Sequence, residues 1–167
     1  MKHLNNKDFA EYIGYIGLDK NDTIWILDTY KFKSANSIRD VVPDISNIFI
    51  IEHYPEEFTR MCETNPGYTL VLGKLQEFIP HFTKVAPEKR IAGVYFDYTG
   101  TFIKSGVLNA IKKLNTVFSR QFVFCATFCQ PRNVKNLKKN QRASIYPQLN
   151  VPFSINGFRT NIVFSRQ

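Results

Sequence analysis

Residues 91–102 read IAGVYFDYTGTF, and the first seven of them form an apolar run that closes on an aspartate. A short apolar run followed by a polar stretch with glycine is typical of a buried β-strand and the turn after it. Asp97 would then lie at the carboxyl end of this strand. Its role, whether as a reactive group, a ligand contact or a strand end, depends on what the rest of the chain places around it.

Similar short apolar runs recur along the chain, and helical patterns separate them. The expected strands are residues 23–28, 47–53, 69–73, 91–97 and 121–128. The expected helices are residues 7–18, 34–42 with Ser34 as N-cap, 55–65, 105–120, and a short one in 74–85 broken at Pro80. This alternation predicts an α/β fold with a Rossmann-like, mostly parallel open sheet and helices on both faces. Residues 151–157 and 160–166 are expected to end the sheet as a C-terminal antiparallel hairpin.

Length and composition suit one folded unit. The chain has 167 residues, 44% of them apolar, and no linker divides it, so we expect a single α/β domain over 1–167. No apolar run is long enough to cross a bilayer, and the N-terminus lacks a signal-peptide core, so we expect a soluble intracellular protein, cytoplasmic or nuclear. The spacing of Cys62, Cys125 and Cys129 fits neither a disulfide framework nor a zinc site, and no metal site is expected.

Charge is distributed unevenly along the chain. Residues 1–97 hold all 14 acidic residues and 11 Lys or Arg, a balance of −3, whereas residues 98–167 hold 11 Lys or Arg and no acid, a balance of +11. A basic segment of this length attracts polyanions through counterion release, so we expect nucleic acid as a partner. The alternative is compositional drift, with the lysines on a solvated helix face. The expected nucleic-acid contacts are Lys104, Lys112, Lys113, Arg132, Lys135, Lys138, Lys139 and Arg142.

Polar residues follow several of the expected strands. Asp28, Glu52 and Asp97 each stand at a carboxyl end, as do Gly73 and Thr127. Ligands of open parallel sheets bind beyond these ends, where the strand order switches. A carboxylate there can accept hydrogen bonds from two hydroxyl groups at once. The sequence therefore predicts a ligand crevice at one edge of the sheet.

The order of elements resembles the class I S-adenosylmethionine-dependent methyltransferase fold. The stretches TIWILDT (23–29), GKLQEF (73–78) and VYFDYTGTF (94–102) stand where that family has its first cofactor loop, its adenine-flanking segment and its substrate-facing loop. The resemblance implies S-adenosylmethionine as the cofactor, with Glu52 on the ribose hydroxyls and Asp97 and Tyr98 facing the substrate as catalytic residues. The cofactor-binding residues that it implies are Asp28, Thr29, Glu52, His53, Leu75 and Gln76.

The first loop departs from the family pattern. It reads DTYKFKSANS (28–37) and contains no glycine, whereas the family's loop is usually glycine-rich. Either this loop binds the cofactor with its side chains, or the cofactor pocket has been lost. The second case would fit a viral or otherwise fast-diverging protein that keeps the methyltransferase scaffold without methyl transfer. Asp28 could equally be a cap at the end of its strand.

Two alternatives to a methyltransferase remain. Asp97, Thr99, Gly100 and Thr101 also match the haloacid-dehalogenase phosphatase signature, in which the aspartate is the phosphoryl-accepting nucleophile. That chemistry needs Mg²⁺ on further carboxylates, which that family draws from late in its chain, and no acid follows Asp97. The other alternative is a non-catalytic methyltransferase-like module that binds nucleic acid. We expect a methyltransferase-like enzyme that acts on nucleic acid.

Overall fold

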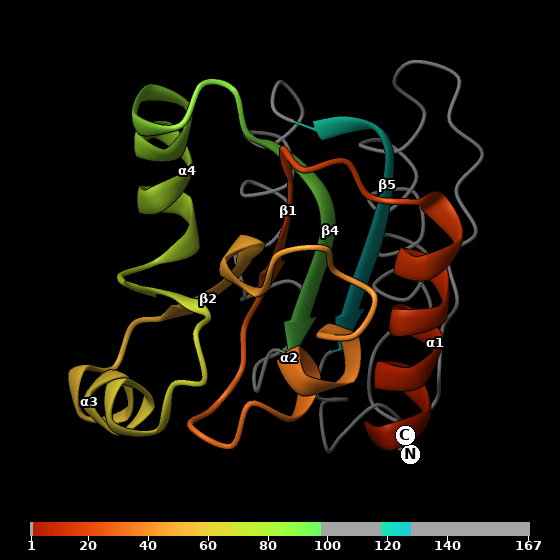
Figure 1. The fold of residues 1–167 in the computed structure, drawn as a ribbon. Coiled ribbons are helices and arrows are strands. Elements are labelled where there is room, and N and C mark those ends of the chain that lie inside the picture. Colours follow the sequence, from red (N-terminus) through yellow and green to blue (C-terminus); the bar gives the residue numbers. More distant parts are fainter. Residues whose placement is uncertain (1, 98–117, 128–167) are drawn as a thin grey trace, which may run out of the picture.

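The computed structural model describes residues 2–97 and 118–127 (Figure 1). Short strands and helices alternate along this part of the chain, as the sequence predicts. The elements are α1 (Lys2–Ile16), β1 (Asp22–Ile26), α2 (Lys33–Ile38), a 3₁₀ turn η1 (Ile45–Asn47), β2 (Ile48–Glu52), α3 (Pro55–Thr64), β3 (Thr69–Leu72), α4 (Leu75–Val85), β4 (Arg90–Asp97) and β5 (Phe118–Thr127).

The five strands of the described part form one sheet in the order β3-β2-β1-β4-β5, and every neighbouring pair is parallel. Trp25 in the central strand β1 pairs with Phe49 on one side and Val94 on the other. The chain winds outward from β1 first to β2 and β3 and then to β4 and β5. The switch in strand order therefore lies between β1 and β4, where such sheets bind their ligands.

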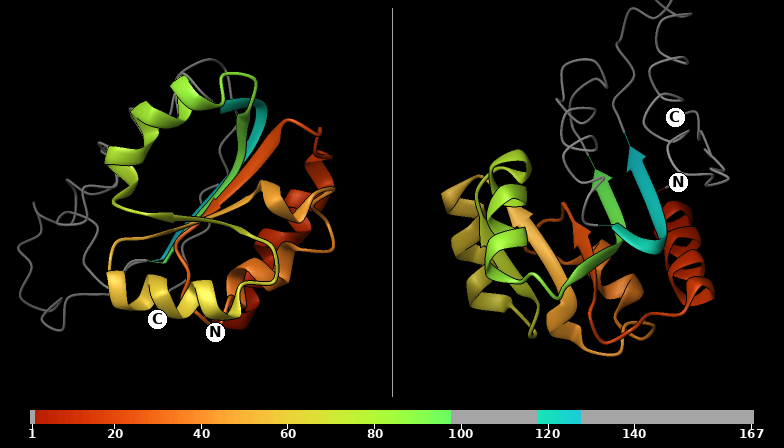
Figure 2. Two further views of the ribbon diagram at one scale, coloured as in Figure 1. Left: turned by 60° about the vertical axis from the view of Figure 1, so that its left-hand side comes forward. Right: turned by 90° about the horizontal axis from the view of Figure 1, so that it is seen from above.

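Helices cover both faces of the sheet. Figure 2 shows α1, α2 and α3 on one side and α4 on the other. Since side chains alternate along a strand, Ile24 and Ile26 enter the core under the first three helices, while Trp25 points to α4. The Trp25 ring lies 5.1 Å from Phe78 and 4.7 Å from Phe82, measured between ring centroids. The predicted two-faced α/β architecture is confirmed.

Helix α1 packs tightly along β4 because Gly93 leaves room for it. A Cβ atom at Gly93 would lie 2.5 Å from Ile13 Cδ1 and 2.8 Å from Ile24 Cδ1, closer than side chains tolerate. One turn earlier in α1, the ring of Phe9 meets that of Tyr95, with centroids 5.3 Å apart. The helix therefore runs antiparallel to β4, and its N-terminus lies at the carboxyl edge of the sheet.

Several predicted boundaries are wrong; helix α1 begins at Lys2 rather than at residue 7, and α2 ends at Ile38 rather than at residue 42. The predicted helix 105–120 overlaps β5, since Phe118 pairs with Ile91 of β4 and residues 118–120 are strand. Helix α4 passes through Pro80 as one helix, although proline lacks the N–H for a helical hydrogen bond. Phe78 and Phe82 on either side of Pro80 pack on Trp25, and this burial outweighs the missing bond. The expected C-terminal hairpin lies outside the described residues.

Candidate cofactor and substrate site

The carboxyl ends of the strands meet at one edge of the sheet, at the bottom of the view in Figure 1. Because β2, β1 and β4 are parallel neighbours, Glu52, Asp28 and Asp97 all come to this edge. Glu52 and Asp97 are the last residues of their strands, and Asp28 lies two residues beyond the end of β1 at Ile26. The predicted convergence of acidic strand ends is present at the level of the backbone.

Glu52 is held in place by the loop that follows it. Its Oε1 accepts hydrogen bonds from the backbone N–H groups of His53 at 2.6 Å and Tyr54 at 2.7 Å. The same oxygen lies 3.4 Å from His53 Nδ1, and the side chain is only 12% exposed. Within the described ranges, each of these contacts is made by Oε1. Oε2 is therefore the oxygen that could accept hydrogen bonds from a ligand.

The surroundings of Glu52 combine exposed rings with open space. The rings of His53 and Tyr54 lie against each other, 3.7 Å between centroids, and both side chains are exposed. The N–H of Gly73, just after β3, donates to the Glu52 carbonyl oxygen at 2.8 Å. Gly73 has a φ of +151°, and nothing lies within 4 Å of the position that a Cβ atom would take. Glu52 therefore has exposed rings and an unoccupied position at Gly73 in its neighbourhood.

The other predicted adenine contacts lie at the start of α4. Leu75 is 4% exposed, so its side chain packs inside the protein, and Gln76 follows it in the first turn of the helix. The loop from Gly73 brings both residues to the carboxyl edge. The roles of Leu75 and Gln76 beside the adenine stay predictions.

Asp28 closes the first loop by capping α2. Its Oδ2 accepts from the N–H groups of Ser34 at 2.8 Å and Ala35 at 2.9 Å, and its Oδ1 accepts from Thr29 N at 2.9 Å. The expectation that Ser34 is the N-cap is wrong: Ser34 lies inside the helix, and a carboxylate six residues earlier satisfies its N–H. The sequence left open that Asp28 is a cap at the end of its strand; in the structure it caps helix α2 instead. Its contact with a cofactor, and that of Thr29, remains a prediction.

The glycine-free loop is shaped by side-chain contacts. Phe32 has a φ of +47°, a left-handed conformation that is rare for such a bulky residue. Its ring is buried against Tyr68, with centroids 5.3 Å apart, and this burial holds the conformation. Tyr30 N donates to Glu57 Oε1 at 2.9 Å, which ties the loop to α3. The loop thus reaches a defined shape without glycine.

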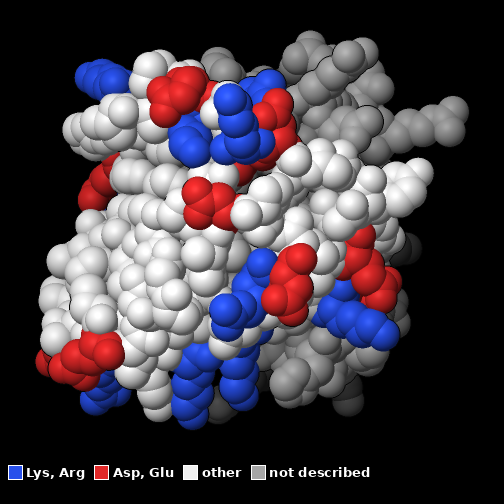
Figure 3. Space-filling view, in the orientation of Figure 1, with Lys and Arg blue, Asp and Glu red and all other residues white. Residues whose placement is uncertain are grey.

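The substrate side of the edge is only partly described. Asp97 pairs with Thr127 across β4 and β5, so its backbone lies beside the end of β5. Tyr98 and all eight predicted nucleic-acid contacts, from Lys104 to Arg142, lie outside the described residues. On the described face in Figure 3, basic and acidic side chains are interspersed, without a large patch of one sign.

Sequence reasoning missed Asn6, a buried polar residue near this edge. Asn6 stands three residues before Phe9, on the same side of α1, and is only 5% exposed. Its Oδ1 has no hydrogen-bond partner in the part of the chain that is described. Asn6 lies at helical spacing from the apolar residues Phe9 and Ile13, and this spacing could have indicated from the sequence that Asn6 is on the buried side of the helix.

Two classes of feature are absent from residues 2–97 and 118–127. No helix there is both long and apolar enough to span a membrane. No group of three His, Cys, Asp or Glu side chains there could hold a metal ion.

Comparison with known proteins identifies the fold. The sequence matches no protein-family model and no curated protein. The structure of the plantazolicin methyltransferase BamL, in complex with a triazolic desmethylPZN analog and SAH, matches 93% of this chain with a TM-score of 0.63 at 8% identity. Fibrillarin in its complex with Nop5p matches 80% with a TM-score of 0.54 at 10% identity. The chain has the class I methyltransferase fold.

This fold likeness covers only part of the two solved structures. The chain spans 62% of the BamL chain and 63% of the fibrillarin chain. At such low identity, the likeness establishes the architecture, and the order β3-β2-β1-β4-β5 agrees with it. The class I resemblance expected from the order of strands and helices is confirmed for the fold.

Proposed function

We propose that the protein is an S-adenosylmethionine-dependent methyltransferase that acts on nucleic acid. The observation that carries the cofactor assignment is Glu52, a largely buried carboxylate at the end of β2 that keeps Oε2 for a ligand. Oε2 in this position suits a pair of ribose hydroxyls, since one carboxylate oxygen has two lone pairs and can accept two hydrogen bonds. The similar BamL structure holds SAH, which supports the same cofactor here.

The residues at the carboxyl edge suit distinct parts of the cofactor. Glu52 would take the ribose hydroxyls, and His53 with the open space at Gly73 would flank the adenine. Leu75 and Gln76 at the start of α4 would complete that side, while Asp28 shapes the loop in which Thr29 lies. The cofactor supplies an activated methyl group on sulfur. The protein's contribution is to hold donor and acceptor in line, which requires no catalytic triad.

We assign the substrate side to Asp97 and Tyr98. The end of β4 lies next to the end of β1, so an acceptor group held there would be close to the loop after β1. Asp97 would accept a hydrogen bond from the substrate amine, and Tyr98 would stack on its base. The acid-free segment 98–167, with its 11 basic residues, supports a polyanionic substrate.

A non-catalytic nucleic-acid-binding module is the second candidate. The observation that favours it is the first loop, in which Phe32 is buried and Tyr30 is tied to α3. Such a loop has less freedom to move aside for a cofactor than a glycine-rich one. This module would keep the basic segment as its binding surface.

Calorimetric titration with S-adenosylmethionine and SAH separates these functions, together with salt-dependent binding to a mixed-sequence oligonucleotide. The methyltransferase should bind both cofactor forms and transfer a labelled methyl group to the oligonucleotide. Oligonucleotide binding without cofactor binding would favour the module. Release of phosphate from an aryl phosphate by the wild type, and its loss in Asp97→Asn, would instead support the phosphatase alternative with Asp97 as the nucleophile.

A further inference from the structure

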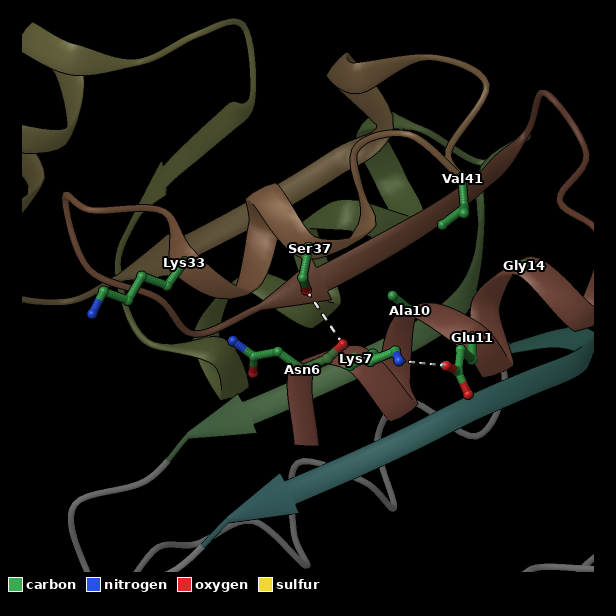
Figure 4. A pocket seen from close by; sticks show the side chains of 8 residues that line it. All are labelled: Asn6, Lys7, Ala10, Glu11, Gly14, Lys33, Ser37 and Val41. Carbon is green, nitrogen blue, oxygen red and sulfur yellow. Dashed lines mark hydrogen bonds and ion pairs between the residues drawn. The ribbon is translucent and has the colours of Figure 1, made fainter. Parts of the chain in front are cut away.

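A groove of about 340 Å³ lies between α1 and α2 (Figure 4). Both helices begin at the carboxyl edge of the sheet, so the groove opens at the same edge as the proposed methyl-transfer site. Asn6 and Lys33 lie at this end of the groove, and Gly14 and Val41 lie at the other. Its volume is within the range of small-molecule pockets.

Asn6 gives this groove a polar end that the protein itself does not satisfy. The residue is 5% exposed and lines the groove, yet among the described residues nothing donates a hydrogen bond to its Oδ1. Buried polar groups are normally paired, so an unpaired amide oxygen beside a groove points to a ligand that donates to it. The terminal torsion of asparagine is broad, and rotation about it turns either end of the amide toward the groove.

The groove wall beyond Asn6 is small and apolar. Ala10 and Gly14 lie one turn apart on α1, and Val41 faces them, with its Cγ1 3.6 Å from where a Cβ atom of Gly14 would lie. This surface suits a flat ring better than a bulky or branched group. Between the polar and apolar ends, Ser37 Oγ lies 3.4 Å from the Asn6 carbonyl oxygen, while its proton is donated to the Ser34 carbonyl oxygen at 2.6 Å.

Charged groups stand at the rim. Lys33 is the first residue of α2, and its side chain extends outward past the open end of the groove, away from Asn6 (Figure 4). Lys7 pairs with Glu11 at 3.8 Å across one turn of α1. Lys33 stands at the end of the groove where Asn6 lies, whereas Lys7 points toward Glu11, so Lys33 is the cation of the rim best placed for an anionic group at that end.

We propose that this groove binds an adenine nucleotide, with the base on Asn6 and the apolar wall and the phosphate near Lys33. An asparagine amide pairs with adenine through two hydrogen bonds, accepting from the exocyclic amine and donating to a ring nitrogen. The proposal rests on the proposed function: the nucleotide would be one unit of the nucleic-acid substrate, held next to the unit that is methylated. It is a site separate from the adenosyl site at Glu52.

The experiment is a calorimetric titration of AMP into the full chain with SAH at saturation, so that the cofactor site is occupied. Wild-type protein should bind AMP, and Asn6→Leu should weaken the binding about 5- to 150-fold, the loss that corresponds to one two-bond base contact. Gly14→Leu, which fills the apolar end and leaves Asn6 in place, should also block AMP. The matched control, Asn21→Leu at the opposite edge of the sheet, should bind AMP like the wild type.

The thermal stability of these variants separates a ligand contact from a structural role. Because Asn6 Oδ1 lacks a partner in the described part, Asn6→Leu should leave the Tm of the free protein unchanged or raise it. A lowered Tm in Asn6→Leu, or unchanged AMP affinity in both groove variants, would overturn the proposal. AMP binding that SAH abolishes would place the nucleotide in the cofactor site and would equally overturn it. If the protein binds AMP through Asn6 but does not bind SAH, the nucleotide site in the groove would be supported and the proposed methyltransferase function would be contradicted.

Discussion

Replacement of Glu52 by glutamine tests the cofactor assignment with little change in structure. The amide oxygen of the new side chain can keep the bonds that Oε1 now accepts from the N–H groups of His53 and Tyr54. The amide nitrogen takes the place of Oε2 and can no longer accept from a hydroxyl. A hydrogen bond to a charged group contributes about 1.5–3 kcal/mol, so the Kd for SAH should rise about 10- to 150-fold. The free energy of unfolding should fall by about 2–3 kcal/mol, since two hydrogen bonds to a charged group become neutral ones.

The assay is isothermal calorimetry with SAH, paired with urea unfolding of the same samples. Glu56→Gln is the matched control, because Glu56 is an exposed residue in the first turn of α3 and its replacement removes the same charge. The control should bind SAH like the wild type. If Glu52→Gln binds SAH as tightly as Glu56→Gln does, the reasoning about Oε2 is wrong.

Three further predictions concern stability. Asp28→Ala removes the cap of α2, so the free energy of unfolding measured in urea should fall by about 0.5–2 kcal/mol. An unchanged urea midpoint would mean that the cap does not stabilise the protein. Gly93→Ala places a methyl group against Ile13, and the same assay should show a loss of about 1–3 kcal/mol, whereas a neutral effect would contradict the close packing of α1 on β4. Burial raises the pKa of Tyr68 above the ordinary value of 10.0, and its hydroxyl donates to Asn36 at 2.6 Å. A raised pKa in the folded state stabilises the protein below pH 10, and this stability is lost as the pH rises further, so wild type should lose stability above pH 10 more steeply than Tyr68→Phe.

The strands could be predicted because each is a local apolar run. The cores of the expected strands 23–28, 47–53, 69–73 and 91–97 coincide with β1 to β4, and the end of β2 falls at Glu52 as expected. Parallel strands bring their carboxyl ends together, so placing acids at strand ends was enough to place them at one edge of the sheet.

The errors arise where distant contacts decide the local structure. Nothing near Ser34 in the sequence shows that Asp28 will reach across the loop to cap α2. Pro80 reads as a helix breaker until the packing of Phe78 and Phe82 on Trp25 is known. Phe118 fits both a helical stripe and a strand, and its pairing with Ile91 makes it a strand.

Asn6 shows the same limit at the candidate site. Its position on the buried side of α1 could be inferred from Phe9 and Ile13, but whether its amide finds a partner depends on the packing of α1 against α2. The unpaired oxygen is therefore a property of the folded protein that the sequence does not display.

The most direct test of the account is an amide NMR titration of the full chain with SAH. A cofactor bound at the carboxyl edge should shift the signals of His53, Tyr54 and Gly73, whose N–H groups surround Glu52. The signals of Asp19 and Asn21 at the opposite edge should stay in place. Shifts confined to that opposite edge, or no shifts at saturating SAH, would contradict the proposed cofactor site.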